Sequence, residues 1–182
     1  MYVTEQPISR EKLRILAKAF KSHLGFGGLF VDVPWLLEVT MHKFTDLDVE
    51  IVKDEVLDKL VFADFIPRDS IKDNRPLIRI KESVYNNACN KNSGSYGRDR
   101  MSIVHEIAHF ILIDQVKVPV YKHHGSGRPD LARTTEWQAM ALAGEIIMPF
   151  EETEHIKDVF ELSQKCGVST DAANYRINKY TR

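Results

Sequence analysis

Apolar positions along the chain follow two patterns, one typical of helices and one typical of strands. Between positions 13 and 20 they recur every three or four residues, which predicts a first helix that ends near the glycines at 25–28. A second short helix is predicted after Pro34, because proline suits the first turn of a helix and an apolar run follows it.

Three short segments rich in β-branched and aromatic residues come next, bounded by Asp, Pro or Asn, at 49–52, 61–65 and 77–80. They predict three strands of a small sheet. Helical patterns dominate afterwards, at 82–89, 99–113 and 134–147, and the last of them stops before Pro149. This order predicts an α+β fold that is mostly helical, with a small three-stranded sheet and a C-terminal helical segment.

Composition favours one compact domain that binds another protein. The chain has 182 residues, of which 43% are hydrophobic and 28% charged, and its formal net charge is -1. Near-neutral charge argues against strong nonspecific binding of nucleic acid or of a membrane surface. Cys89 and Cys166 lie too far apart for a metal-ligand or redox motif, which favours reduced thiols. No apolar run reaches the length of a membrane span, so we expect a cytoplasmic protein.

One segment indicates a chemistry, the His-Glu-x-x-His sequence formed by His105, Glu106 and His109. Helical residues four apart differ by about 40° in direction and about 6 Å in rise, so both imidazoles can bind one metal ion from one face. Glu106 lies beside them, where a carboxylate can take a proton from a metal-bound water and pass it to a leaving amine. The spacing therefore predicts the metal site of a metallopeptidase.

The competing explanation for this motif is a surface helix whose histidines face water. Nearly all of its neighbours between 101 and 113 are apolar, which predicts a buried helix instead. Buried imidazoles and a buried carboxylate carry a large desolvation cost unless a partner satisfies them. A metal ion is such a partner, so the metal site is the favoured interpretation.

Catalytic zinc takes three protein ligands and leaves one position for water, so a third ligand is expected outside the motif. Glu136 and Glu145 are the candidates. Both belong to one apolar helix, and at nine residues apart they face opposite sides of it. Glu136 lies near the helix start, beside a polar loop, and can point into a cleft. Glu145 lies deeper, where we expect a structural role with a buried arginine or a backbone donor.

Polar, glycine-containing loops flank the motif helix at 90–97 and 118–130. Such loops commonly carry substrate contacts. The second loop holds Tyr121, His123, His124 and Arg128, each of which is a candidate donor to the oxyanion formed at an attacked carbonyl. Plain solvation is the stronger explanation for any single one of them.

Several of these segments together resemble the ImmA/IrrE family of bacterial and phage metallopeptidases. They are RMSIVHEIAHFIL at 100–112, EWQA at 136–139, AGEIIMP at 143–149 and CGVSTDAANYRI at 166–177. The resemblance spans about 49–177. It implies a zincin-like fold in one domain, with N-terminal helices at 1–46, the zincin-like core at 47–155 and the C-terminal helical segment at 156–182.

The resemblance further implies a gluzincin-like Zn²⁺ site, with His105, His109 and Glu136 as ligands and Glu106 as general base and acid. Family members cleave helix-turn-helix repressors, so it also implies a repressor as the protein substrate. One residue departs from the wider thermolysin-like pattern. Where an aspartate often orients a zinc histidine, four positions after the third ligand, this chain has Met140. We also expect an extended substrate to pair with an edge of the sheet at 77–80.

Other functions stay open at this point. Residues 168–177 also resemble the turn and second helix of a DNA-binding helix-turn-helix, with basic groups at Lys165, Arg176, Lys179 and Arg182. Acidic residues just upstream balance them, which favours a helical pair that packs on the core or binds protein. The zinc site without peptidase activity is another alternative. Two histidines and a carboxylate also suit non-haem iron, but the helical motif favours zinc.

Overall fold

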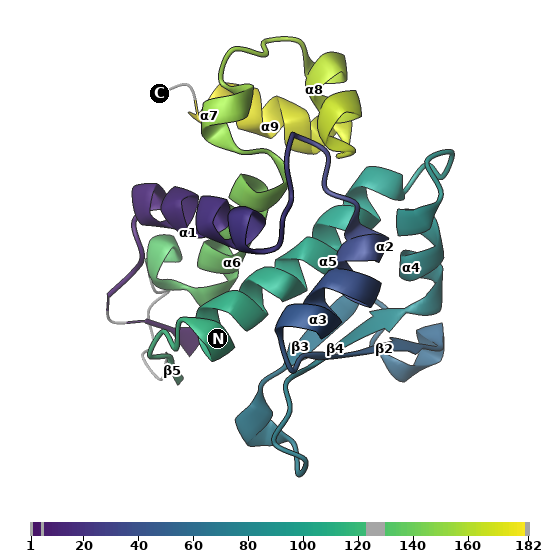
Figure 1. Cartoon of the computed structure of the whole chain (residues 1–182), viewed down its shortest axis with the longest axis vertical. Coiled ribbons are helices and arrows are strands. Elements are labelled where there is room, and N and C mark those ends of the chain that lie inside the picture. The colour runs from purple at the N-terminus through teal and green to yellow at the C-terminus, as the bar shows by residue number, and fades with distance from the viewer. Residues whose placement is uncertain (1, 5, 123–129, 181–182) are drawn as a thin grey trace.

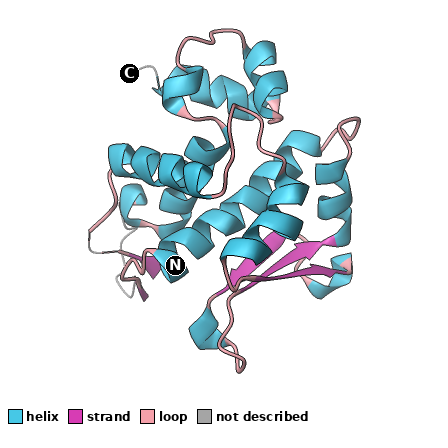
Figure 2. Cartoon of the chain, in the orientation of Figure 1, coloured by secondary structure: helices cyan, strands magenta, loops and turns pink. Residues whose placement is uncertain are grey.

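The computed structural model describes residues 2–4, 6–122 and 130–180 (Figure 1). A small sheet and a larger set of helices make up an α+β fold, as the sequence pattern predicts (Figure 2). The sheet contains β2 (Asp48–Val52), β3 (Ala63–Ile66) and β4 (Leu77–Lys81). Their order is β2-β4-β3, with β2 parallel and β3 antiparallel to β4.

The place of β4 in this sheet corrects one expectation. We expected the segment at 77–80 to offer a free edge to a substrate, but β4 lies in the middle and is paired on both sides. Ile78 and Ile80 are fully buried, because the central strand packs its apolar face on the helices. The strand that lies beside the motif helix with one edge unpaired in the sheet is β3.

The motif helix α5 (Tyr96–Phe110) crosses the middle of the molecule and continues into a π-helical turn, η4 (Ile111–Gln115) (Figure 1). It packs against α6 (Thr135–Ile147) and against α4 (Glu82–Cys89). Ile103, Val104 and Ile107 are completely buried, which confirms the buried helix predicted from its apolar neighbours.

The N-terminal helices cover the two flanks of this arrangement. α1 (Arg10–His23) packs on α6, with Leu13 fully buried. The helical run predicted after Pro34 is confirmed: it consists of α2 (Val33–Trp35), the π-helical η1 (Leu36–Met41) and α3 (His42–Phe44). Asp32 begins this run, because its carboxylate accepts a hydrogen bond from the Trp35 backbone N–H.

α7 (Phe150–Thr153) follows α6, and the C-terminal segment then consists of α8 (Val159–Cys166) and α9 (Thr170–Tyr180). The turn between α8 and α9 lies directly against the start of α5. A Cβ atom at Gly97 would be 2.2 Å from the backbone nitrogen of Ser169, so only glycine permits this approach. The buried guanidinium of Arg100 donates hydrogen bonds to the carbonyls of Gly167 and Val31. The C-terminal segment is therefore packed on the core.

Short elements complete the described chain. β1 (Tyr2–Val3) pairs with β5 (Tyr121–Lys122), a two-stranded contact that the hydrophobic pattern did not predict. Single helical turns occur at η2 (Asp54–Val56), η3 (Arg68–Ser70) and η5 (Leu131–Arg133). Cys89 and Cys166 are both free thiols. Within the described ranges, no helix has the length and apolarity that crossing a membrane requires.

Candidate metal centre

Both histidines of the motif project from one face of α5. Their rings meet edge to face, and His105 Nε2 lies 3.1 Å from His109 Nε2. The side chain of His105 is 12% exposed and that of His109 is 9% exposed, so both imidazoles are largely withdrawn from solvent. The four-residue spacing thus brings two nitrogen donors to one point.

Glu136 reaches the two imidazoles from the first turn of α6. Thr134 begins this helix, because its hydroxyl accepts a hydrogen bond from the Trp137 backbone N–H at 3.1 Å. One Glu136 carboxylate oxygen lies 3.2 Å from His105 Nε2, and the other lies 3.4 Å from His109 Nε2. Hydrogen bonds from these imidazoles hold the pKa of Glu136 well below its usual range. The carboxylate is therefore ionised, which is the form that binds a metal.

The distances among the three donors fit a single ion. The ligand atoms of His105, His109 and Glu136 all lie within 4.8 Å of one another. Two donors bound at about 2.0–2.1 Å to one tetrahedral zinc ion lie roughly 3.3–3.4 Å apart. The nearest donor pairs here are separated by 3.1, 3.2 and 3.4 Å. Two imidazoles and a carboxylate are also a known donor set of catalytic zinc, so these residues fit that ion.

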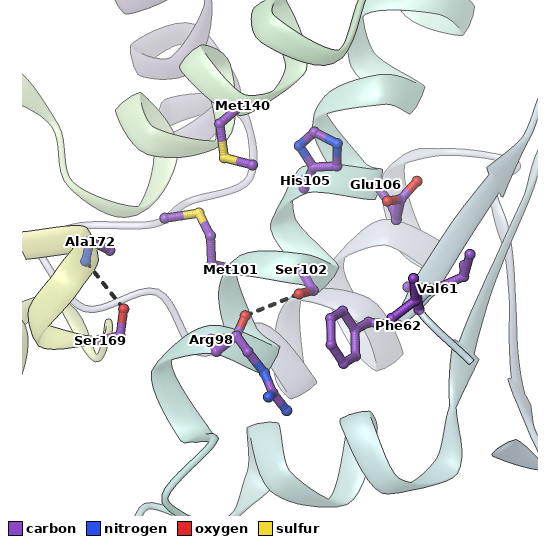
Figure 3. A pocket seen from close by; sticks show the side chains of 12 residues that line it. Val61, Phe62, Arg98, Met101, Ser102, His105, Glu106, Met140, Ser169 and Ala172 are labelled. Atoms are coloured by element: carbon purple, nitrogen blue, oxygen red, sulfur yellow. Dashed lines mark hydrogen bonds between the residues drawn. The ribbon is translucent and has the colours of Figure 1, made fainter. Parts of the chain in front are cut away.

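Glu106 lies beside this donor group and lines two cavities. One has a volume of about 420 Å³ (Figure 3) and the other about 470 Å³, and Glu106 and Ala63 line both. Burial raises the pKa of Glu106 to about 7, and the negative charges of Glu136 and Asp64 add to that rise. A cation held by the three donors would lower this pKa. Glu106 is thus a carboxylate that can take up and release a proton beside the donor group.

Glu145, the other candidate for the third ligand, serves a different purpose. Its oxygens accept hydrogen bonds from Arg176 at 2.9 and 2.8 Å, and from the Phe150 backbone N–H at 3.2 Å. The side chain is 3% exposed, and at nine residues after Glu136 it lies on the opposite side of α6. The structural role expected for Glu145, with a buried arginine and a backbone donor, is confirmed.

The loop candidates for oxyanion stabilisation remain predictions. His123, His124 and Arg128 lie outside the residues that the structure describes. Tyr121 belongs to β5 and is 49% exposed. Its neighbour Val120, rather than Tyr121 itself, lines the larger of the two cavities beside Glu106.

Met140 takes the position where related zinc sites carry a histidine-orienting aspartate. It lies one turn after Glu136 on α6 and is 51% exposed. The Nδ1 atom of His105 is buried and has no hydrogen-bond partner among the described residues. The ring orientation of His105 is thus set by packing and by its Nε2 contacts in the part of the chain that the structure describes.

Strand β3 contributes a part of the site that the sequence analysis missed. A backbone hydrogen bond from Phe65 reaches the Glu106 carboxylate, whereas the Phe62 carbonyl accepts from the Lys81 N–H of β4 at 3.1 Å. Because successive residues of a strand point their backbone groups to opposite sides, Ala63 and Phe65 present theirs to the free edge. The sequence showed a strand here, but nothing in its pattern says which strand lies at the edge.

The basic residues proposed for DNA binding are partly occupied within the protein. Arg176 is buried in its ion pair with Glu145, and Lys165 pairs with Glu161 at 2.7 Å. Ser169 and Ala172, at the start of α9, line the cavity beside His105 and Glu106 (Figure 3). The start of the helix that would enter a DNA groove therefore forms part of the wall of the cleft.

A comparison with protein families matches residues 89–178 to the IrrE N-terminal-like domain, Peptidase_M78. The match is shorter than the span of 49–177 over which the sequence resembles the family, because it starts after the sheet. No curated protein matches the chain. The matched segment contains the motif helix, Glu136, α7, α8 and most of α9. Over residues 89–178 the chain thus carries an IrrE N-terminal-like domain of Peptidase_M78, a family of metallopeptidases.

Proposed function

We propose that this protein is a zinc-dependent endopeptidase that cleaves a specific protein substrate, a helix-turn-helix transcriptional repressor. The observation that carries the proposal is the convergence of His105, His109 and Glu136 on one point, with Glu106 beside them and lining two cavities. A non-catalytic metal site is usually closed by four protein ligands, whereas three leave a position for chemistry.

His105, His109 and Glu136 would hold the ion. Bound there, zinc would supply a Lewis acid for the scissile carbonyl and would acidify a water molecule. Glu106 is placed to accept the proton of the attacking water and to deliver it to the leaving amine. Its burial makes it a stronger base than an exposed carboxylate, because desolvation disfavours the charged form.

An extended substrate segment fits the free edge of β3. The backbone groups of Ala63 and Phe65 face that edge, and Glu106 lies next to it. Pairing with an edge strand holds a peptide by its main chain and aligns successive bonds with the site. This pairing replaces the one expected at β4, because β4 is already paired with β2 on one side and β3 on the other.

The test compares wild type with Glu106→Gln, incubated with the repressor encoded by a neighbouring gene. We expect one zinc ion per chain in both proteins, and cleavage by wild type alone. Glu161→Gln is the matched control, because Glu161 lies at the surface of α8 and is half-exposed. It should bind zinc and cleave as wild type does. Cleavage by Glu106→Gln at the wild-type rate would contradict the role of Glu106, and the absence of zinc from wild type would overturn the proposal.

The alternative is a zinc-binding regulatory or DNA-binding module without peptidase activity. The burial of Arg176 counts against DNA binding through α9. Duplex DNA binding that weakens steeply with added salt would favour that alternative, because phosphate contacts release counterions. Zinc binding that stays intact in Glu106→Gln, together with an unchanged biological effect, would favour a binding role.

A further inference from the structure

A cavity of about 420 Å³ opens next to His105 and Glu106 (Figure 3). Its volume is many times the ~30 Å³ that a water molecule occupies, so it has room for a large side chain. Its walls come from four parts of the chain: Leu60 and Phe62 before β3, Met101 on α5, Met140 on α6 and Ala172 on α9. All five side chains are apolar. The walls of this apolar pocket are thus built by segments that are distant in sequence.

Apart from His105 and Glu106, the polar side chains that line the same cavity each make a contact within the protein. Ser102 donates its hydroxyl hydrogen to the Arg98 carbonyl, and the Ser169 hydroxyl accepts from the Ala172 backbone N–H (Figure 3). The Arg98 guanidinium pairs with Asp99 at 2.7 Å and lies over the Phe62 ring at 4.6 Å. The pocket therefore offers a ligand mainly apolar surface, next to His105, Glu106 and the half-exposed guanidinium of Arg98.

The outer wall of the pocket is held in place and exposes apolar surface. Buried Lys81 donates hydrogen bonds from Nζ to the Asp58 and Lys59 carbonyls, which fixes the loop before β3. Leu60 in this loop is 87% exposed, and Met140, which lines the same cavity, is 51% exposed. Clustered exposed apolar side chains at the mouth of a cavity are typical of binding surfaces.

The second cavity that Glu106 lines is more polar. Polar side chains of Asp64, Ser70, Thr135 and Glu136 line it, beside the apolar side chains of Phe65, Pro67, Ile113 and Val120. The cleft around the donor group is therefore asymmetric, with an apolar half toward α9 and a more polar half toward the end of α5. A substrate that crosses Glu106 would place unlike side chains in the two halves.

We propose that the apolar pocket binds a large apolar side chain, leucine, methionine or an aromatic residue, next to the scissile bond of the substrate. The pocket would thereby select the bond that is cleaved. This inference rests on the proposed peptidase function and adds to it the chemical class of one substrate residue. Methionine walls suit this role, because an unbranched thioether adapts to apolar side chains of different shape.

The test measures binding rather than cleavage. Zinc-loaded protein is titrated by calorimetry with acetohydroxamate, which chelates zinc but has no large side chain, and with 3-phenylpropanohydroxamate. For wild type we expect the phenyl compound to bind about 10-fold tighter or more, the gain typical of burying a ring. In Ala172→Phe the new ring fills the pocket, and the affinity ratio should fall toward one. Ala19→Phe, on the exposed face of α1, is the matched control and should keep the wild-type ratio.

Met140→Trp gives a second way to fill the pocket at a half-exposed position, in case Ala172→Phe folds poorly. Acetohydroxamate binding would show that the metal site is intact. The proposed pocket would then be overturned by an affinity ratio near one for wild type, or by a wild-type ratio in both substituted proteins. If the protein retained no zinc, or neither hydroxamate bound, the proposed function itself would fail and the inference would fail with it.

Discussion

Glu145 of α6 and Arg176 of α9 form a bidentate ion pair inside the protein, in which two guanidinium nitrogens lie 2.9 and 2.8 Å from the two carboxylate oxygens. Their side chains are only 3% and 4% exposed. Arg14 of α1 approaches the same carboxylate at 3.3 Å, and the Phe150 backbone N–H donates to it at 3.2 Å. One buried carboxylate thus joins α1, α6 and α9 and holds the C-terminal segment against the core.

Arg176→Met should destabilise the protein by about 3 kcal/mol, because it leaves Glu145 buried with weaker partners. The measurement is urea unfolding followed by circular dichroism. Lys165→Met is the control, since it breaks the exposed pair with Glu161 and should cost no more than about 1 kcal/mol. Equal losses in the two variants would show that the buried pair does not hold α9.

Gly97→Ala should cost about 1–3 kcal/mol through overpacking, because its methyl group would lie 2.2 Å from Ser169 N and 2.3 Å from the Val168 carbonyl carbon. Gly94→Ala, three residues earlier, meets nothing within 4 Å and should change the stability by less than about 1 kcal/mol. Thermal unfolding of the two variants measures the difference. Equal melting temperatures for Gly97→Ala and Gly94→Ala would mean that the α8–α9 turn moves to accommodate the methyl group without loss of stability.

The local elements could be predicted from the sequence because their signals are local. The apolar positions around His105, the helix end before Pro149 and the helical turn after Pro34 all depend on neighbours a few residues apart. The distinction between Glu136 and Glu145 was also local, since nine residues on one helix place them on opposite sides.

What could not be predicted depends on contacts between distant segments. The strand order β2-β4-β3 follows from which apolar faces pack together, and β4 looks no different in sequence from an edge strand. The close approach of Gly97 to Ser169 could not be predicted either, because a glycine in a sequence is compatible with many kinds of local structure. It is this approach that brings Ala172 to the wall of the cleft.

Stability should depend on pH through Asp114, whose carboxylate accepts hydrogen bonds from Arg68 at 2.6 and 2.9 Å. Arg68 lowers the pKa of Asp114, so the stabilisation is fully present above the unfolded-state pKa of about 4 and is lost as the pH falls through the lower folded-state pKa. Asp114→Asn should cost roughly 2 kcal/mol at pH 7. Unfolding curves of wild type and variant should converge below about pH 4, whereas a constant difference down to pH 2 would contradict this account.

Ala63→Pro should slow repressor cleavage several-fold and leave the fold intact. The Ala63 N–H faces the free edge of β3, so proline there removes a donor to the substrate but no bond to β4. One hydrogen bond contributes about 0.5–1.5 kcal/mol, or roughly 2- to 13-fold in rate. Asp64→Pro is the matched contrast, because the Asp64 N–H faces β4 and its loss should unfold the sheet edge. Cleavage by Ala63→Pro at the wild-type rate would exclude substrate pairing at this edge.

Glu136→Ala should weaken zinc binding on the order of 100-fold or more, because loss of a ligand should exceed the 10–100-fold cost of losing an outer partner. The fold should survive, since the side chain is 66% exposed. Competition with a coloured zinc chelator measures the affinity. Glu145→Gln separates the two candidate ligands: it should lower the stability, since it breaks the pair with Arg176, yet the protein that remains folded should bind zinc as wild type does. The two carboxylates lie on opposite sides of α6 and cannot both face His105 and His109. If Glu145→Gln weakened zinc binding as much as Glu136→Ala does, the assignment of Glu136 as the third ligand would therefore be wrong.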